Sequence, residues 1–204
     1  PKIHTKVRGK TTANANQKGG VGKTTKAMNL PASLAKNRRK VLLVDCDPQA
    51  NASSGIGVDT GKVDCSVYEA MVGLKDIREA VYTTEIDNLD VVPSNVNLSG
   101  ADIELMQFEK REYKTRKMLE TIKPDYDFII IDCSPSLGLI TVNALTAADS
   151  VIIPVQCEYF ALEGISQLLN TIRMIKKRLN PALEIEGFLL TMYDRRLRLA
   201  NQIY

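Results

Sequence analysis

Residues 18 to 25 read Lys-Gly-Gly-Val-Gly-Lys-Thr-Thr, a composition suited to holding a chain of phosphates. Glycines allow a loop to turn several backbone amides toward one anion, because they carry no Cβ that would block the turn. A helix that begins near Lys23 would add the positive end of its dipole at the same place. The segment therefore predicts a nucleotide phosphate site whose loop consists of Gly19, Gly20, Val21 and Gly22.

The loop departs at one position from the strict phosphate-loop pattern, because Gln17 stands where that pattern has its first glycine. The chemistry does not depend on that position. Lys23 can still reach the β- and γ-phosphates, the Thr24 hydroxyl can ligate magnesium, and Thr25 can contact the α-phosphate. The alternative, a glycine-rich turn with ordinary surface lysines, does not account for all eight residues together. We therefore expect ATP and Mg²⁺ as the ligands.

Carboxylates support this assignment. Asp45 ends a predicted strand at 41–44, and Asp132 ends another at 128–131. Both should project over the edge of the sheet at which the loop lies, so that either can hold the magnesium shell. Asp47, two residues after Asp45, lies on the same side of an extended chain and could orient the attacking water. Each aspartate could instead cap the turn that follows its strand.

A basic cluster near the end of the chain is a candidate anion-binding face. Residues 171–198 contain three acids against seven basic residues, which are Arg173, Lys176, Lys177, Arg178, Arg195, Arg196 and Arg198. On charge alone, a solvated helix face explains such a cluster better than nucleic acid does.

Composition excludes several protein classes. The 204 residues are 44% hydrophobic and carry a net charge of +3, which is ordinary for one globular α/β domain and names no partner. No apolar run approaches the length of a membrane span, and residues 1–20 lack the apolar centre of a signal peptide, so we expect a cytosolic protein. Four cysteines without a CxxC pair indicate free thiols: Cys46, Cys65, Cys133 and Cys157.

Short apolar runs alternate with helical patterns along the whole chain. Strands are predicted at 41–44, 89–92, 128–131, 151–153 and 185–190, and helices at about 23–36, 66–80, 97–122, 138–147 and 160–179. The polar segment 46–65 suits a loop at the carboxyl end of a strand. This alternation predicts an α/β fold with a mainly parallel sheet and helices on both faces.

Several motifs resemble the ParA/Soj family of bacterial DNA-partition ATPases, within the deviant Walker A group of P-loop NTPases that also contains MinD-type ATPases. The motifs lie at 17–25, 44–53, 131–136, 155–164 and 191–194, and so span nearly the whole chain in the family's order. The run Asp47-Pro48-Gln49 and the segment from Gln156 to Gly164 favour ParA over MinD.

The resemblance implies a role for each matching residue. Lys18 would be the signature lysine that reaches across a dimer interface to the partner's nucleotide, so that ATP holds two subunits together. Asp45 and Asp132 fall at the magnesium-associated aspartates and Asp47 at the water-activating one. Further positions are Arg196, implicated in nonspecific DNA binding, and Met192, near the adenine.

Three features depart from the family pattern. The segment 11–16 should form a buried, apolar central strand, yet it carries Thr12 and Asn14. Pro31 falls inside the helix after the loop, where it removes a backbone donor. The sequence stops at Tyr204, so that the single P-loop ATPase domain at 1–204 is expected to lack the family's C-terminal strand and helix.

The resemblance implies a weak ATPase that dimerises with ATP and serves chromosome or plasmid partitioning. The ATP-bound homodimer would bind DNA without sequence preference at the nucleoid, with no membrane attachment, and a centromere-binding ParB-type protein would stimulate hydrolysis. Two alternatives remain open. One is a MinD-like positioning ATPase, which needs a basic amphipathic tail to bind membrane. The other is a small-molecule enzyme of the dethiobiotin-synthetase kind, which would carry its own acceptor pocket.

Overall fold

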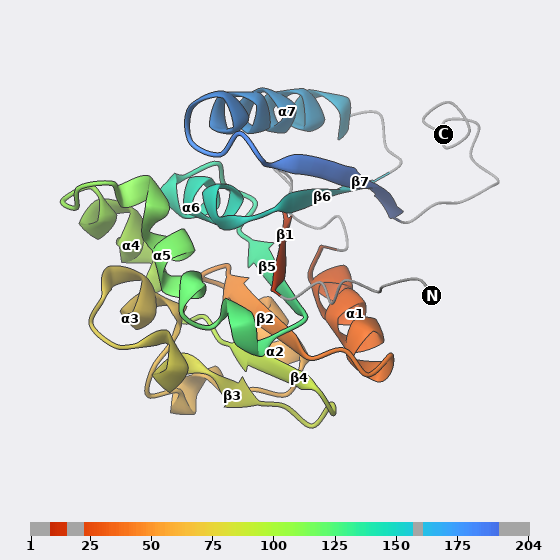
Figure 1. The fold of residues 1–204 in the computed structure, drawn as a ribbon, viewed down its shortest axis with the longest axis vertical. Coiled ribbons are helices and arrows are strands. Elements are labelled where there is room, and N and C mark those ends of the chain that lie inside the picture. Colours follow the sequence, from red (N-terminus) through yellow and green to blue (C-terminus); the bar gives the residue numbers. More distant parts are fainter. Residues whose placement is uncertain (1–8, 16–22, 157–160, 192–204) are drawn as a thin grey trace, which may run out of the picture.

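A computed structural model describes residues 9–15, 23–156 and 161–191, with backbone only at 23–27, 156, 161–163 and 191. These residues contain a seven-stranded sheet in the order β3-β4-β2-β5-β1-β6-β7 (Figure 1). All neighbouring strands are parallel except β3 and β4. The strands are β1 Lys10–Asn14, β2 Val41–Cys46, β3 Tyr82–Thr83, β4 Leu89–Val92, β5 Phe128–Cys133, β6 Ser150–Gln156 and β7 Glu184–Thr191.

The α-helices are α1 Lys23–Lys36, α2 Asn51–Gly55, α3 Val67–Val72, α4 Leu98–Leu105, α5 Lys114–Glu120, α6 Leu139–Ala147 and α7 Ala161–Arg178. Short 3₁₀ turns lie at η1 Thr60–Lys62, η2 Ile77–Ala80, η3 Arg111–Tyr113 and η4 Lys123–Asp125. The structure thus confirms the predicted α/β fold, the mainly parallel sheet and the helix at 23–36.

Two of the predicted helices were wrong in their extent. The segment 66–80 is divided because Gly73 adopts a left-handed conformation with φ of 83° and caps the end of α3. The segment 97–122 is divided between α4 and α5, and Lys110 between them has φ of 51°. The polar segment 46–65 also contains the short helix α2, which follows a left-handed Ala50.

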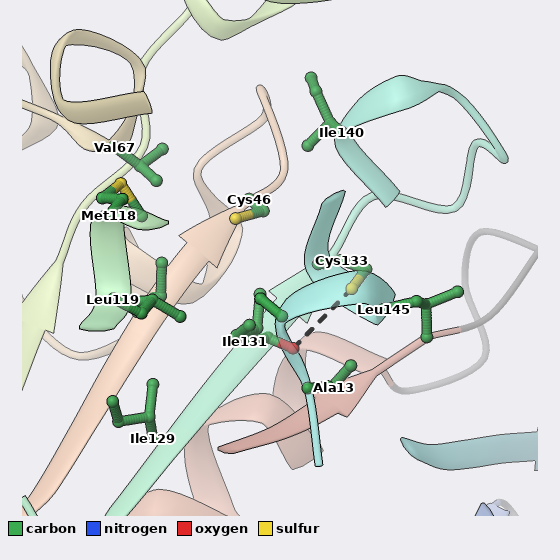
Figure 2. Close-up of a cluster of buried hydrophobic side chains, with 14 of the residues drawn as sticks. Ala13, Cys46, Val67, Met118, Leu119, Ile129, Ile131, Cys133, Ile140 and Leu145 are labelled. Carbon is green, nitrogen blue, oxygen red and sulfur yellow. Dashed lines mark hydrogen bonds between the residues drawn. The ribbon is translucent and has the colours of Figure 1, made fainter. Parts of the chain in front are cut away.

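Alternating side chains of the central strands face two separate cores, as expected for a sheet covered on both sides. Figure 2 shows part of the larger core, where Cys46, Ile129 and Ile131 of the sheet lie with Leu119 of α5 and Leu145 of α6. The smaller core lies on the opposite face, where α1 and α2 pack against β2 and β5. Its residues include Leu30, Leu34 and Ala35 of α1, Ala52 of α2, and Val41, Leu43 and Ile130 of the sheet. Helices therefore cover both faces of the sheet.

The polar residues of β1 have partners in the fold. Thr11 Oγ1 donates to the Gly9 carbonyl at 3.1 Å, and the hydroxyls of Thr12 and Ser150 lie 3.1 Å apart. A buried polar group is tolerated when it is hydrogen-bonded. The central position of β1, between β5 and β6, is therefore compatible with its sequence.

Pro31 lies inside α1, and the helix continues past it to Lys36. Its ring is buried, but nothing in the structure explains why proline occupies this position. Cys46, Cys65 and Cys133 are reduced and buried, as predicted, and Cys157 lies outside the described residues. Within the described part of the chain, none of the helices has the length and apolar character needed to cross a bilayer.

Candidate functional site

The predicted phosphate loop has the strand and helix that it requires on either side. β1 ends at Asn14 and α1 begins at Lys23, so the loop joins the carboxyl end of a central strand to a helix N-terminus. This is the setting in which a glycine-rich loop can bind phosphate, because the helix dipole and the loop amides then act on the same anion. The loop residues 16–22, and the side chains of Lys23, Thr24 and Thr25, lie outside the described part of the structure.

Three polar residues form a row across the sheet, near the carboxyl ends of β1, β5 and β2. Asn14 of β1 is in register with Asp132 of β5, and Asp132 is in register with Asp45 of β2. Residues in register on neighbouring strands share a face, and alternation places these three on the face that carries Leu43 and Ile130, which is covered by α1. The fold thus brings Asp45 and Asp132 side by side near the carboxyl ends of β2 and β5, at one edge of the sheet, as the sequence predicted.

The Asp45 carboxylate is fully buried and accepts three hydrogen bonds. Oδ1 accepts from the Asp47 amide at 3.0 Å, while Oδ2 accepts from the Ser53 amide at 2.9 Å and from the Ser53 hydroxyl at 2.7 Å. Burial raises the pKa of Asp45 above its ordinary value, against the opposing effect of these donors. Asp45 therefore closes the β2–α2 connection, and it lies within β2 rather than after it.

Ser53 extends this network to the neighbouring strand. Its hydroxyl oxygen accepts from the Ser94 amide, which follows β4, at 3.2 Å. The Ser94 hydroxyl itself is fully buried and has no hydrogen-bond partner among the described residues. The carboxyl ends of β2 and β4 are thus tied together through one serine.

Asp47 has the capping role that the sequence left open for it. Its Oδ1 accepts from the Gln49 amide at 3.1 Å, and its carbonyl accepts from the Ala50 amide at 2.8 Å. These bonds shape the turn into α2. The side chain is buried, with 7% exposure, so it lies beneath the surface at the carboxyl edge of β2. Capping does not exclude a second role, since a carboxylate has several acceptor sites.

Asp132 is held differently, by Asn14. In the sequence, Asn14 was notable only as a polar residue in a strand that was expected to be apolar. Asn14 Nδ2 donates to Asp132 Oδ1 at 3.1 Å, and both side chains are buried, with 6% and 1% exposure. The available signal was a polar residue in a strand that should be apolar on both faces. The identity of its partner could not be seen, because it depends on which strand lies beside β1.

The oxygen donors at this edge fit Mg²⁺ by type. Magnesium favours carboxylate and hydroxyl oxygens, and it is usually held by one or two protein carboxylates together with substrate phosphates and water. Within the described residues, no group of three or more His, Cys, Asp or Glu side chains is placed to hold a metal ion. Of the predicted ligands, the side chains of Asp132 and Asp45 are described and the side chain of Thr24 is not.

Other predicted site residues lie outside the described residues, namely Lys18, Gly19, Gly20, Val21, Gly22, Met192 and Arg196. Part of the basic cluster is described on α7. The apolar side of that helix packs into the larger core through Leu168, Ile172 and Ile175. The exposed side carries Arg173, Lys176, Lys177 and Arg178.

Comparison with known proteins identifies the family. Residues 9–185 match the family model described as AAA domain. The chain is 55% identical to the sporulation initiation inhibitor protein Soj of Bacillus subtilis over 96% of its own length and 77% of that protein. It is 52% identical to the chromosome partitioning protein ParA of Myxococcus xanthus, over 96% of its length and 69% of that protein.

The chain belongs to the ParA/Soj family of chromosome-partitioning ATPases. Solved structures agree with this family's fold. A plasmid partition protein from Borrelia burgdorferi superposes with a TM-score of 0.84 at 32% identity, over 96% of this chain and 83% of that one. A cobyrinic acid a,c-diamide synthase from Mycobacterium smegmatis, solved with bound ADP and magnesium, gives a TM-score of 0.91 at 40% identity, over 95% of this chain and 79% of that one.

Proposed function

We propose that this protein is an ATP-driven switch for chromosome or plasmid partitioning. ATP binding joins two copies into a dimer, the dimer binds DNA without sequence preference, and hydrolysis releases it. The observation that carries the proposal is the row of Asn14, Asp132 and Asp45 across the sheet, together with the glycine-rich sequence that joins β1 to α1, in a chain of the ParA/Soj family.

Each residue of the loop has a part in binding the nucleotide. The amides of Gly19, Gly20, Val21 and Gly22 and the Lys23 ammonium hold the phosphates, and Thr25 contacts the α-phosphate. Thr24, Asp132 and Asp45 would hold Mg²⁺. The metal supplies charge stabilisation to the transferred phosphoryl group. Both oxygens of Asp45 accept hydrogen bonds from its own connection to α2, and one oxygen of Asp132 accepts a hydrogen bond from Asn14.

Hydrolysis requires an oriented water and a stabilised phosphoryl group. Asp47 orients the water from its buried position at the carboxyl edge of β2. Lys18 of one copy contacts the nucleotide of the other, so a complete site forms only in the dimer. Met192 would contact the adenine, as the family resemblance implies. This arrangement couples the nucleotide state to the oligomeric state.

DNA contact follows from the basic side of α7 together with Arg196. The four exposed basic residues of α7 provide a positive surface on a helix whose other side is fixed in the core. Such a surface binds phosphates and reads no bases, so affinity should fall with salt equally for unrelated sequences. The DNA-bound form would place the protein at the nucleoid, where a centromere-binding ParB-type partner stimulates hydrolysis.

The oligomeric state of the full-length protein, with and without ATP and Mg²⁺, tests this function. We expect a monomer without nucleotide and a dimer with ATP. Lys23→Ala should lose nucleotide binding, and Lys18→Ala should keep binding but lose the dimer. Arg196→Glu should keep the dimer and lose DNA affinity equally on two unrelated duplexes. A wild-type protein that stays monomeric with ATP would refute the switch.

One observation favours a second candidate, a small-molecule P-loop enzyme: the high structural similarity to the cobyrinic acid a,c-diamide synthase. Higher identity to Soj and ParA favours partitioning. ATP turnover that depends strictly on a small acceptor would decide for the enzyme, and turnover stimulated by DNA with a ParB-type protein would decide for the switch.

A further inference from the structure

Asn14 stands where the fold calls for an apolar side chain. β1 lies between β5 and β6 in the middle of the sheet, and both of its neighbours are parallel strands. Strands of this kind are buried on both faces and are built mainly from apolar residues. An asparagine amide buried here, at 6% exposure, is tolerated only where it meets a partner.

The partner of Asn14 is a carboxylate of the proposed nucleotide site. Nδ2 donates to Oδ1 of Asp132 at 3.1 Å, across 118 positions of the sequence. The two residues are also in register, so their Cα atoms are held side by side by the β1–β5 ladder. The torsion that turns a carboxylate about its Cβ–Cγ bond is intrinsically broad. A hydrogen-bond donor that is fixed on the adjacent strand restricts this torsion, and so fixes the orientation of the carboxylate plane.

We propose that Asn14 is a positioning residue that orients the Asp132 carboxylate toward the nucleotide-bound magnesium. The inference rests on the proposed function, since it assigns Asn14 a part in that same site. Mutation of a partner that holds a metal-ligating group in place typically lowers metal affinity or activity by about 10–100-fold. Asn14 is also the last residue of β1, so the strand that carries it leads directly into the phosphate loop.

Thr12 provides a matched control on the same strand. It lies two residues before Asn14, so it faces the same side of the sheet, and its exposure is 5%. Its hydroxyl is paired with that of Ser150 at 3.1 Å, on the other neighbour of β1. Replacing Thr12 therefore removes a buried hydrogen bond from β1 without touching Asp132.

The test compares Asn14→Leu, Asn14→Ala and Thr12→Val in the full-length protein. Leucine approximates the shape of asparagine without its hydrogen-bond donor. Alanine also removes the donor, and its smaller side chain cannot clash with the neighbouring residues. Binding of fluorescently labelled ADP is titrated once with excess Mg²⁺ and once with EDTA. The ratio of the two dissociation constants is the magnesium gain, a quantity that requires no turnover. Thermal unfolding of each variant is recorded in parallel.

We expect both Asn14 variants to keep the wild-type affinity in EDTA and to lose about tenfold in magnesium gain. Thr12→Val should keep the full gain, even where its melting temperature falls. An unchanged gain in the Asn14 variants would overturn the proposal, as would an equal loss in Thr12→Val. Failure of both Asn14 variants to fold would also overturn it, by assigning Asn14 to stability alone. A wild-type protein without any magnesium gain would instead refute the proposed function.

Discussion

Two aspartates at the same edge of the sheet are held in opposite ways. Asp45 receives all three of its hydrogen bonds from residues at most eight positions along the chain, in the connection between β2 and α2. Asp132 accepts a hydrogen bond from Asn14 on another strand, 118 positions away. A carboxylate such as Asp45, whose hydrogen bonds come from its own connection, stabilises that connection. A carboxylate such as Asp132, which is oriented by a neighbouring strand, depends on the assembled sheet and is better suited to bind a ligand.

The first way to break this comparison is Asp45→Ala, for which we expect the largest effect. Three buried donors lose their acceptor, and each unsatisfied donor costs about 1–3 kcal/mol. The free energy of unfolding should therefore fall by roughly 3 kcal/mol or more, measured by urea denaturation. Asp47→Ala is the control, since the Asp47 carboxylate accepts from the Gln49 amide at the turn into α2. It should lose ATP hydrolysis while keeping most of its stability. Similar stability losses in both variants would contradict the contrast.

Asp132→Ala should act mainly on magnesium binding. The buried Asn14 amide loses its acceptor, which should cost about 1–3 kcal/mol of unfolding free energy. The magnesium gain in nucleotide affinity should disappear, because the proposed ligand is gone. Titration of labelled ADP with Mg²⁺ and with EDTA measures this directly. A full magnesium gain in Asp132→Ala would move the ligand role to Asp45.

Sequence patterns were sufficient to predict most helices and strands, but not the hydrogen bonds that hold Asp45 and Asp132. The apolar runs located the sheet, and α1 was predicted with both of its ends. The predicted helix at 66–80 was too long, because its apolar pattern continues past Gly73. Glycine is a common helix terminator, and α3 ends directly before it. The pairing of Asn14 with Asp132 could not be predicted, because it follows from the strand order, and strand order is decided by packing of the whole chain.

The raised pKa of Asp45 predicts that the stability of the protein depends on pH. Burial raises its pKa above the ordinary value of 3.8, so the folded protein retains a proton that the unfolded chain releases. Wild-type stability should therefore lose a contribution from this group as pH rises from 3.8 to the raised pKa. Asp45→Asn cannot ionise and should lack that loss. The measurement is the free energy of unfolding in urea, plotted against pH for the wild type and for Asp45→Asn. Parallel plots for the two proteins would contradict the expectation.

The smallest effect is expected at Ser94, the serine that follows β4 on the far side of the Asp45 network. Its amide donates to Ser53, but its buried hydroxyl has no partner among the described residues. Ser94→Ala should leave stability unchanged or raise it by up to about 1 kcal/mol, because a desolvated, unpaired hydroxyl is removed. Ser53→Ala is the matched control. It removes the hydroxyl that donates to Asp45 and accepts from Ser94, so about 1–3 kcal/mol should be lost. Equal losses in both serine variants, measured by urea denaturation, would mean that the Ser94 hydroxyl does have a partner, such as a buried water. The network around Asp45 would then extend beyond its own loop, and the contrast with Asp132 would weaken.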